Sequence, residues 1–212
     1  MDDSLRLLAR AARTEIRSGA LRGAALLERL LAVPPHERDA WTDELLRLEA
    51  PPPDVADLPR GAVPYLPCGV EEIVTMVREL PLRASDELVD LGSGLGKVVM
   101  LAHLLCGARA SGVEIQAPLV QGARERCAEL GLDTISFLHA NAADTELAGS
   151  VFFLNAPFNG QLLTAVLGRL EHVAHSRAIA VCTVGLELHG VPWLKPRSPS
   201  RVSLTLYDSR RL

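Results

Sequence analysis

The stretch that decides the fold is Glu87–Lys97, which reads ELVDLGSGLGK. Its apolar part, Leu88–Leu91, predicts a short buried strand, and the apolar run that follows predicts a helix over about Lys97–Cys106. The turn between strand and helix carries a glycine at every second position. A flat ligand can approach the backbone of such a turn closely, and the new helix points its first N–H groups at that ligand. The glycines are Gly92, Gly94 and Gly96.

A second strand is predicted over Ala110–Ile115, and it carries an acidic residue, Glu114, at its end. A carboxylate at a strand end beside a glycine turn accepts the hydroxyls of a ribose in nucleotide-binding α/β folds. The glycine spacing is G-x-G-x-G, whereas a nicotinamide-binding turn reads G-x-G-x-x-G. The alternative is a turn without a ligand, although glycines at this density cost conformational entropy that such a turn need not lose.

Length and composition limit the possible functions. The chain has 212 residues and a net charge of −4, which argues against a protein that mainly grips nucleic-acid phosphates. Its four cysteines are scattered without a C-x-x-C pair, so we expect buried free thiols and no metal. The acidic start lacks the layout of a signal peptide, and no apolar run approaches the ~20 residues of a membrane span. We therefore expect a cytoplasmic protein with no membrane partner.

The first 60 residues have their own pattern. Apolar residues at helical spacing predict one helix that continues until Pro34 and Pro35 end it. A second helix is predicted over about Glu37–Leu48, and the four prolines of Ala50–Pro59 predict an extended linker. We thus expect a helical N-terminal extension with a Pro-rich linker over residues 1–60. Its role is either a cap that covers the sheet or a lid over the substrate.

Residues 61–212 form the second predicted part. It starts with a turn, Val63–Gly69, that two prolines brace before a helix over Val70–Leu80. Because this helix leads into the glycine strand, we expect the braced turn to return to the mouth of the same site. Tyr65 of this turn is either a core ring with its hydroxyl in water, or a wall of the cofactor or acceptor pocket.

Further strands and helices alternate along the rest of the chain, as in an α/β fold. Gly131 is placed to end a helix as a C-cap glycine. The predicted elements are a helix over Leu119–Leu130, strands over Ile135–His139 and Val151–Leu154, a helix over Gln161–Val173, a strand over Ala178–Val184, an irregular connection over Pro192–Pro199, and a closing strand over Ser203–Tyr207.

The end of the Val151–Leu154 strand is the second strong signal. It delivers the tetrapeptide Asn155-Ala156-Pro157-Phe158 to the edge of the sheet at which the glycine turn lies. A polar amide, a proline and an aromatic ring there form a small polar notch with a hydrophobic wall, where α/β sheets place ligands. The alternative is a plain turn in which the asparagine bonds its own backbone.

Together these motifs resemble known families. The D-x-G-x-G-x-G form of Asp90–Gly96, with Glu114 on the next strand, resembles motif I and its partner in class I S-adenosylmethionine-dependent methyltransferases. The tetrapeptide at Asn155 resembles the N-P-P-Y/F of methyltransferases that act on planar nitrogens, with alanine for the first proline. The glycine motif and the Phe-Phe-Leu-Asn strand look like the Dot-type histone lysine methyltransferases. The Pro-Tyr-x-Pro lead-in and Leu206–Asp208 look like the ATP synthase c-subunit lysine methyltransferases, and the similarity covers roughly Val63–Asp208.

The resemblance implies a Rossmann-like class I methyltransferase fold, with a mostly parallel seven-stranded sheet flanked by helices. It implies S-adenosylmethionine as cofactor, S-adenosylhomocysteine as product, and N-methylation of an amine such as a protein lysine. Asn141 stands where this class usually has an acid that accepts from the adenine amino group. The implied cofactor residues are Tyr65, Asp90, Gly92, Ser93, Gly94, Gly96, Glu114, Ile115, Asn141, Ala142 and Asn155. The implied acceptor residues are Tyr65, Asn155, Pro157 and Phe158, with Asn155 and Phe158 in the catalytic roles.

The chain also departs from both families, which leaves the acceptor open. Dot-type enzymes carry an acid in the lead-in turn, which the residues around Cys68 do not supply, and basic flanks that hold nucleosomes. The c-subunit enzymes have an apolar N-terminal anchor, and this N-terminus is amphipathic. The alternatives are a small-molecule N- or O-methyltransferase and a non-catalytic S-adenosylmethionine-binding sensor. An adenine methyltransferase acting on nucleic acid fits the tetrapeptide but not the charge. The oligomeric state stays open.

Overall fold

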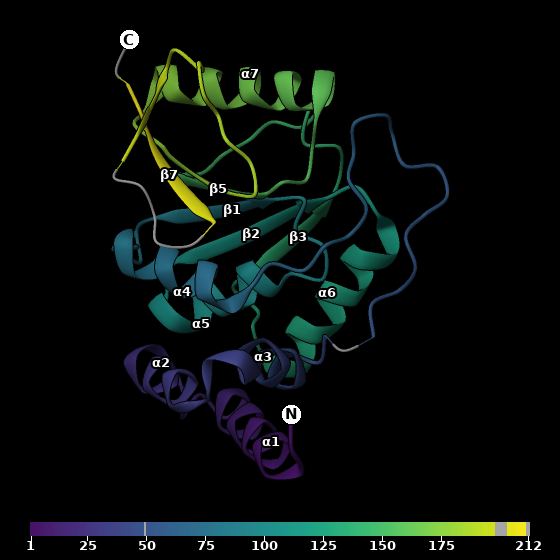
Figure 1. The fold of residues 1–212 in the computed structure, drawn as a ribbon, viewed down its shortest axis with the longest axis vertical. Coiled ribbons are helices and arrows are strands. Elements are labelled where there is room, and N and C mark those ends of the chain that lie inside the picture. The colour runs from purple at the N-terminus through teal and green to yellow at the C-terminus, as the bar shows by residue number, and fades with distance from the viewer. Residues whose placement is uncertain (49, 198–202, 211–212) are drawn as a thin grey trace.

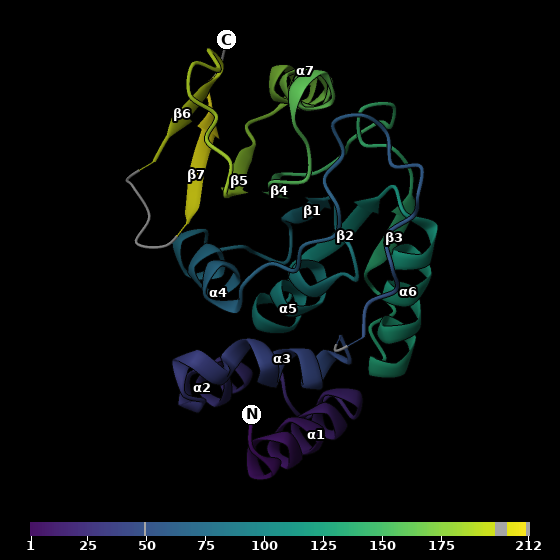
Figure 2. The ribbon, with the colours of Figure 1, turned by 45° about the vertical axis from the view of Figure 1, so that its right-hand side comes forward.

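The computed structural model describes residues 1–48, 50–197 and 203–210, and its elements stack in layers around one sheet (Figure 1). In the described chain one helix, α7 (Gly160–Ser176), covers the first face of the sheet. The opposite face is covered by α4 (Val70–Glu79), α5 (Lys97–Cys106) and α6 (Ala117–Leu130). A further layer beneath α4 and α5 holds α1 (Asp3–Arg17), α2 (Gly23–Ala32), the short 3₁₀ helix η1 (Pro35–Glu37) and α3 (Arg38–Leu46), as Figure 2 shows.

The sheet has seven strands in the order β3-β2-β1-β4-β5-β7-β6. Every pairing is parallel except the two that involve β7, which runs antiparallel to both of its neighbours. The mostly parallel seven-stranded sheet predicted from the sequence is therefore confirmed. The strands are β1 (Glu87–Leu91), β2 (Arg109–Glu114), β3 (Ser136–His139), β4 (Val151–Asn155), β5 (Ala180–Val184), β6 (Leu194–Pro196) and β7 (Leu204–Ser209).

Successive residues of the central strands pack alternately into two separate hydrophobic cores. In β4, Phe153 packs into the core shared with α1–α6, whereas Phe152 and Leu154 pack into the core under α7. Side chains alternate between the two faces of a strand, and both faces are covered by helices, so the strand is apolar along its length. This arrangement leaves the ends of the strands as the places where polar side chains can gather.

The prediction of a single helix before Pro34 was wrong, because this segment forms two helices, α1 and α2. The helix is interrupted between α1 and α2, where Gly19 takes a left-handed conformation with φ of 77°. The break lets α1 fold back and pack against α3, while α2 packs against α5. Ile16 and Leu30 are fully buried in the same core as the sheet-covering helices.

Lys97, the residue that follows the glycine turn, fastens this extra layer to the rest of the molecule. Its ammonium lies 2.8 Å from the carboxylate of Asp39 and 2.9 Å from that of Asp43, both on α3. The Lys97 side chain is 4% exposed, so its charge depends on these partners. Asp39 also accepts the backbone N–H of Val70 at 2.9 Å, which ties the start of α4 to the same point.

A second difference lies near the C-terminus. The segment Pro192–Pro199 was predicted as an irregular connection, but its middle forms β6, a short edge strand that pairs with β7. Pro196 ends this strand, which fits the preference of proline for sheet edges. Pro199 lies outside the described residues.

Candidate active site

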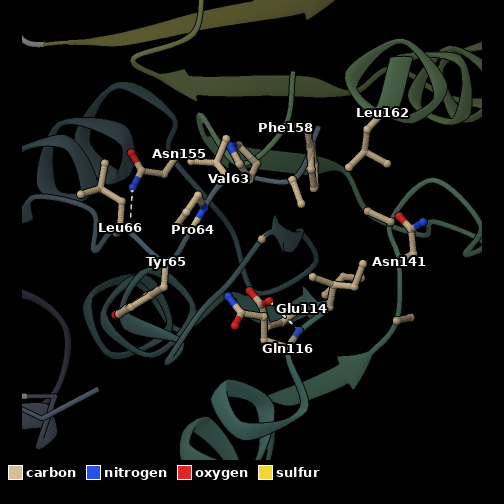
Figure 3. Close-up of a pocket in the computed structure, with 17 residues that line it drawn as sticks. Val63, Pro64, Tyr65, Leu66, Glu114, Gln116, Asn141, Asn155, Phe158 and Leu162 are labelled. Carbon is tan, nitrogen blue, oxygen red and sulfur yellow. Dashed lines mark hydrogen bonds between the residues drawn. The ribbon is translucent and has the colours of Figure 1, made fainter. Parts of the chain in front are cut away.

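The candidate site lies at the carboxyl ends of β1, β2 and β4. The strand order reverses between β1 and β4, and open α/β sheets hold their ligands at such a switch point. Figure 3 shows side chains from the three strand ends and from the braced turn arranged around one space. Phe158 stands on one side of it, and Glu114 and Gln116 stand on the other. The prediction that the braced turn returns to this mouth is confirmed, because Ala62–Leu66 line the cavity.

The glycine turn needs its glycines for backbone geometry. Gly92, Gly94 and Gly96 have φ values of 84°, 51° and 82°, a region that side chains with a Cβ rarely adopt. The space that each Cβ would fill is already occupied by protein: Pro157 at Gly92, the Tyr65 ring at Gly94 and Phe137 at Gly96. Of the three glycines, only Gly92 lines the cavity.

Glu114 is held in place by two backbone donors. The N–H of Gly94 donates to its Oε2 at 2.8 Å, and the N–H of Gln116 donates to its Oε1 at 2.8 Å. The side chain is buried and lines the cavity. A carboxylate oxygen has two lone pairs, so each oxygen can accept one more hydrogen bond from a ligand.

Asp90 and Ser93 lie behind the turn and do not line the cavity. Asp90 is buried, and its Oδ1 has no hydrogen-bond partner among the described residues; the same holds for the Ser93 hydroxyl. Burial, and then the neighbouring charge of Glu114, raise the pKa of Asp90 well above its usual range. A buried acid without a partner, next to a second acid, suits a ligand that carries positive charge.

The end of β4 is joined to the braced turn. The side-chain amide of Asn155 donates to the Leu66 carbonyl at 2.9 Å (Figure 3). The N–H of Val63 donates to the Pro157 carbonyl at 3.0 Å, and Ala62 pairs with Phe158 in an antiparallel bridge. The braced turn therefore runs alongside the tetrapeptide that the sequence singles out.

The tetrapeptide differs from the N-P-P-Y/F motif at Ala156, which stands where that motif has its first proline. The φ of Ala156 is 43°, in the left-handed region. A proline ring fixes φ near −65°, so proline cannot stand at this position in this conformation. The likeness to the enzymes that act on planar nitrogens is therefore one of residue types and does not extend to the backbone.

Asn141 lies in a turn that its own side chain stabilises. Its Oδ1 accepts the N–H of Ala143 at 3.0 Å, and its Nδ2 donates to Asp144 at 2.7 Å. The residue lines the cavity opposite the braced turn, and both amide atoms keep capacity for one further bond.

The cavity brings together nine of the residues singled out from the sequence and leaves out Asp90, Ser93, Gly94 and Gly96. Those that line it are Tyr65, Gly92, Glu114, Ile115, Asn141, Ala142, Asn155, Pro157 and Phe158. Three more, Val63, Pro64 and Leu66, belong to the braced turn that was predicted to lie at this mouth, whereas the sequence reasoning missed Ala62, Val113, Gln116, Ala140 and Leu162. For Gln116 a signal was present, because it follows Glu114 by two residues at the same strand end.

Two kinds of feature are absent from the described part of the chain. There, no group of three or more His, Cys, Asp and Glu side chains is placed to hold a metal ion. Within the same residues, no helix has the length and apolar character needed to cross a membrane.

The fold, taken with the comparisons that follow, identifies the chain as a class I S-adenosylmethionine-dependent methyltransferase. Residues 67–167 match the family described as histone methylation protein DOT1. A comparison with curated proteins finds no match.

Solved structures share the fold. An RNA methyltransferase from Salinibacter ruber in complex with S-adenosyl-L-homocysteine has 23% identity and a TM-score of 0.54, with 68% of this chain and 92% of that chain covered. The Escherichia coli protein yhhF has 18% identity and a TM-score of 0.58, with 74% and 92% covered. A SAM-dependent methyltransferase from Aquifex aeolicus has 15% identity and a TM-score of 0.51, with 65% and 88% covered.

Proposed function

We propose that this enzyme transfers a methyl group from S-adenosylmethionine to an amine nitrogen, with a protein lysine as the acceptor. The observation that carries the proposal is the position of Asn155, whose amide is fixed at the end of β4 beside the glycine turn. In the described chain, α1–α3 contribute no residue to the cavity, because they cover α4 and α5 instead. The edge above β4 is thus free of the N-terminal helices, as a protein acceptor requires.

On the donor side, each residue has a distinct proposed task. Glu114 accepts the two ribose hydroxyls with its remaining lone pairs, and Asn141 accepts from the adenine amino group. Ile115 and Ala142 flank the nucleoside, whereas Tyr65 lies against the glycine turn, Gly92–Gly96, which takes the methionine part. The pKa of the buried Asp90 is raised by burial and by Glu114, and the positive charge of the donor would favour its ionised form. The donor itself supplies an electrophilic methyl group on a sulfonium.

On the acceptor side, the protein has to align and deprotonate the amine. Removing a proton from a lysine with pKa near 10.4 at pH 7 costs about 4.6 kcal/mol, the equivalent of about 3.4 pKa units. Apolar walls such as Phe158 and Pro157 disfavour the charged amine and so lower this cost. Proximity and orientation of the reacting groups can together contribute up to ~7–11 kcal/mol of the barrier, and Asn155 supplies part of that alignment.

A dedicated general base is not part of the proposal. Of the described residues that line the cavity, Tyr65 and Glu114 are the ionisable ones. Burial, and then the charge of Asp43, raise the pKa of Tyr65 to about 12, so its hydroxyl stays protonated at neutral pH. Both Glu114 oxygens already accept backbone donors. We therefore expect desolvation and alignment to dominate the catalysis.

A second candidate function is methylation of a small molecule. One observation favours it: the braced turn closes over the strand ends, so the space left at the site is about 40 Å³. An enclosed site suits a small acceptor better than a protein segment. Binding of the donor without turnover is the remaining alternative from another functional class.

The substitution Asn155→Ala tests the catalytic proposal. Because Asn155 positions the acceptor, we expect methyl transfer to fall at least ~100-fold, while affinity for S-adenosylhomocysteine stays within about threefold by calorimetry. Asn159→Ala is the matched control, since Asn159 is exposed, lies four residues further on and does not line the cavity. An unchanged rate for Asn155→Ala would remove this residue from the mechanism.

The acceptor class is tested with tritiated S-adenosylmethionine and a lysate of the host. Label in a protein band, located on lysine by peptide mapping, supports the protein acceptor. Label that stays in the small-molecule fraction contradicts it and favours the second candidate. Donor binding without label in either fraction indicates the non-catalytic alternative.

A further inference from the structure

The segment Asp54–Leu66, which we call the strap, crosses the mouth of the site from the end of β2 to the end of β4. At the β2 end, Asp54 Oδ1 accepts from the side-chain amide of Gln116 at 2.7 Å and from the N–H of Tyr65 at 2.9 Å. Gln116 Oε1 accepts the N–H of Val55 at 2.9 Å. At the β4 end, backbone bonds of residues 61–63 and the Leu66 carbonyl hold the strap to the tetrapeptide.

Gln116 is the residue at the end of β2 that bonds the strap through its side chain. Its side chain is 2% exposed, and both ends of its amide are engaged by the strap. Its backbone N–H donates to Glu114, the residue proposed to hold the ribose. One residue therefore joins the strap to the nucleoside side of the site. Asp54, in contrast, is exposed, so water can compete for the bonds that it accepts.

The strap leaves too little room for a donor. The cavity beneath it has a volume of about 40 Å³. Such a cavity holds only a few waters, since one water needs roughly 10–15 Å³, whereas pockets for small ligands measure about 300–1,000 Å³. The ring of Tyr65, carried by the strap, also fills the side of Gly94 on which a Cβ would stand. A nucleoside-sized ligand reaches the turn only when the strap moves.

We propose that the strap is a gate for the methyl donor and its product, and that Gln116 is the positioning residue that fastens it. The proposal rests on the proposed donor site. The gate opens at the β2 end, where side-chain bonds to an exposed carboxylate hold it. It stays attached at the β4 end, where the bonds run mainly between backbone groups and extend over several residues.

Binding kinetics of S-adenosylhomocysteine test the gate. With purified full-length protein in a stopped-flow instrument, we expect the observed association rate to reach a plateau as ligand concentration rises, because opening limits it. Gln116→Ala removes two side-chain bonds, so opening becomes easier. Association at the plateau should therefore become faster by about tenfold, and the equilibrium affinity should not fall, because the closed strap and the ligand compete for the same space.

Matched variants separate the gate from a general loss of stability. Gln121→Ala removes an exposed glutamine of α6 that bonds within its own helix, so its association rate should equal that of the wild type. Asp54→Ala should reproduce the faster association. Asp54→Asn keeps an acceptor oxygen for Gln116 and Tyr65, so its association should be slower than that of Asp54→Ala. Unfolding midpoints measured in parallel should stay close to that of the wild type for both Asp54 variants.

The possible outcomes are distinct. Association that rises linearly with ligand concentration to near the diffusion limit overturns the gate and leaves the proposed function standing. The gate is likewise overturned, and the proposed function left standing, if Gln116→Ala and Asp54→Ala reach the same plateau rate of association as the wild type. Absence of any binding in the wild type overturns the donor site itself, and the gate with it.

Discussion

At the scale of single residues, the buried Asp90 lowers the free energy of unfolding when it is ionised. It is buried beside a second acid, and its Oδ1 has no partner among the described residues. Its folded pKa lies above the unfolded value near 3.8, so the folded chain holds the proton more tightly than the unfolded chain. The contribution of Asp90 to stability therefore falls as the pH rises from that value through the folded pKa.

The substitution Asp90→Asn should remove this cost. At pH 7 we expect the urea midpoint of the ligand-free protein to rise, and the affinity for S-adenosylmethionine to fall about tenfold or more. The gain in stability should shrink as the pH is lowered through the folded pKa towards about 3, where Asp90 is mostly protonated in both states. Urea unfolding at several pH values checks the first part, and calorimetry checks the second. A destabilised variant at pH 7 would contradict the assignment.

Sequence reasoning at this scale picked out about half of the residues that line the candidate cavity, but not the contacts between them. Glu114 and Asn155 could be found because strand ends at a switch point place polar groups together. The backbone conformation of Ala156 could not be predicted, because nothing about an alanine indicates a φ of 43°. The ring of Tyr65 against Gly94 is a contact between segments about 30 residues apart, which no local pattern encodes.

At the scale of elements, the buried ion pairs of Lys97 hold α3 against α5. The partners of Lys97 are less buried than the lysine itself: the side chains of Asp39 and Asp43 are 57% and 30% exposed. Once Lys97 is removed, water can solvate these carboxylates, so the loss falls below that of a fully buried pair. The lysine after the glycine turn therefore has a structural task in this chain.

Replacing Lys97 by methionine should lower the free energy of unfolding by about 2 kcal/mol, the range of a hydrogen bond to a charged group. Urea denaturation followed by circular dichroism measures this loss. Lys195→Met is the matched control, because Lys195 is exposed on the edge strand β6 and its replacement should change stability by less than ~0.5 kcal/mol. Equal effects of the two substitutions would show that the ion pairs do not hold the layers together.

Predictions of elements succeeded where the pattern was strong. The strands and helices around the glycine turn lie within three residues of their predicted bounds, since dense apolar runs and the glycine at 131 mark them. The interruption between α1 and α2 was missed because the apolar period continues across it, and isolated glycines such as Gly19 and Gly23 are often tolerated inside a helical pattern. The strand β6 was missed because it has three residues and gains its pairing from β7.

At the scale of the whole molecule, the N-terminal helices and the sheet-covering helices share one core. Trp41 and Leu45 of α3 pack in the same buried cluster as Leu101 and Leu104 of α5. Apolar surface shared in this way couples the unfolding of the two parts. The sequence could not decide between a cap and a lid, because periodicity gives the buried face of a helix but not what covers it. In the structure the helices cover α4 and α5, and the linker crosses the site.

The two tryptophans allow a test of this coupling, because Trp41 lies in α3 and Trp193 lies beside β6 at the other end of the molecule. In Trp193→Phe the fluorescence reports on the N-terminal layer, and in Trp41→Phe it reports on the C-terminal part of the sheet. We expect each variant to show one urea midpoint that agrees with its circular dichroism, as two-state unfolding requires. An earlier transition at Trp41 would show that the N-terminal layer unfolds on its own.

The ion pairs of Lys97 have a consequence for self-modification. The chain has two lysines, and the ammonium of Lys97 is enclosed between two carboxylates, so Lys195 is the side-chain amine that lies in solvent. An enzyme that acts on lysine would therefore offer almost no competing target on its own surface. In a radiolabelling assay, automethylation would be confined to Lys195 and the terminal amine, and Lys195→Arg would lower that background without touching the site.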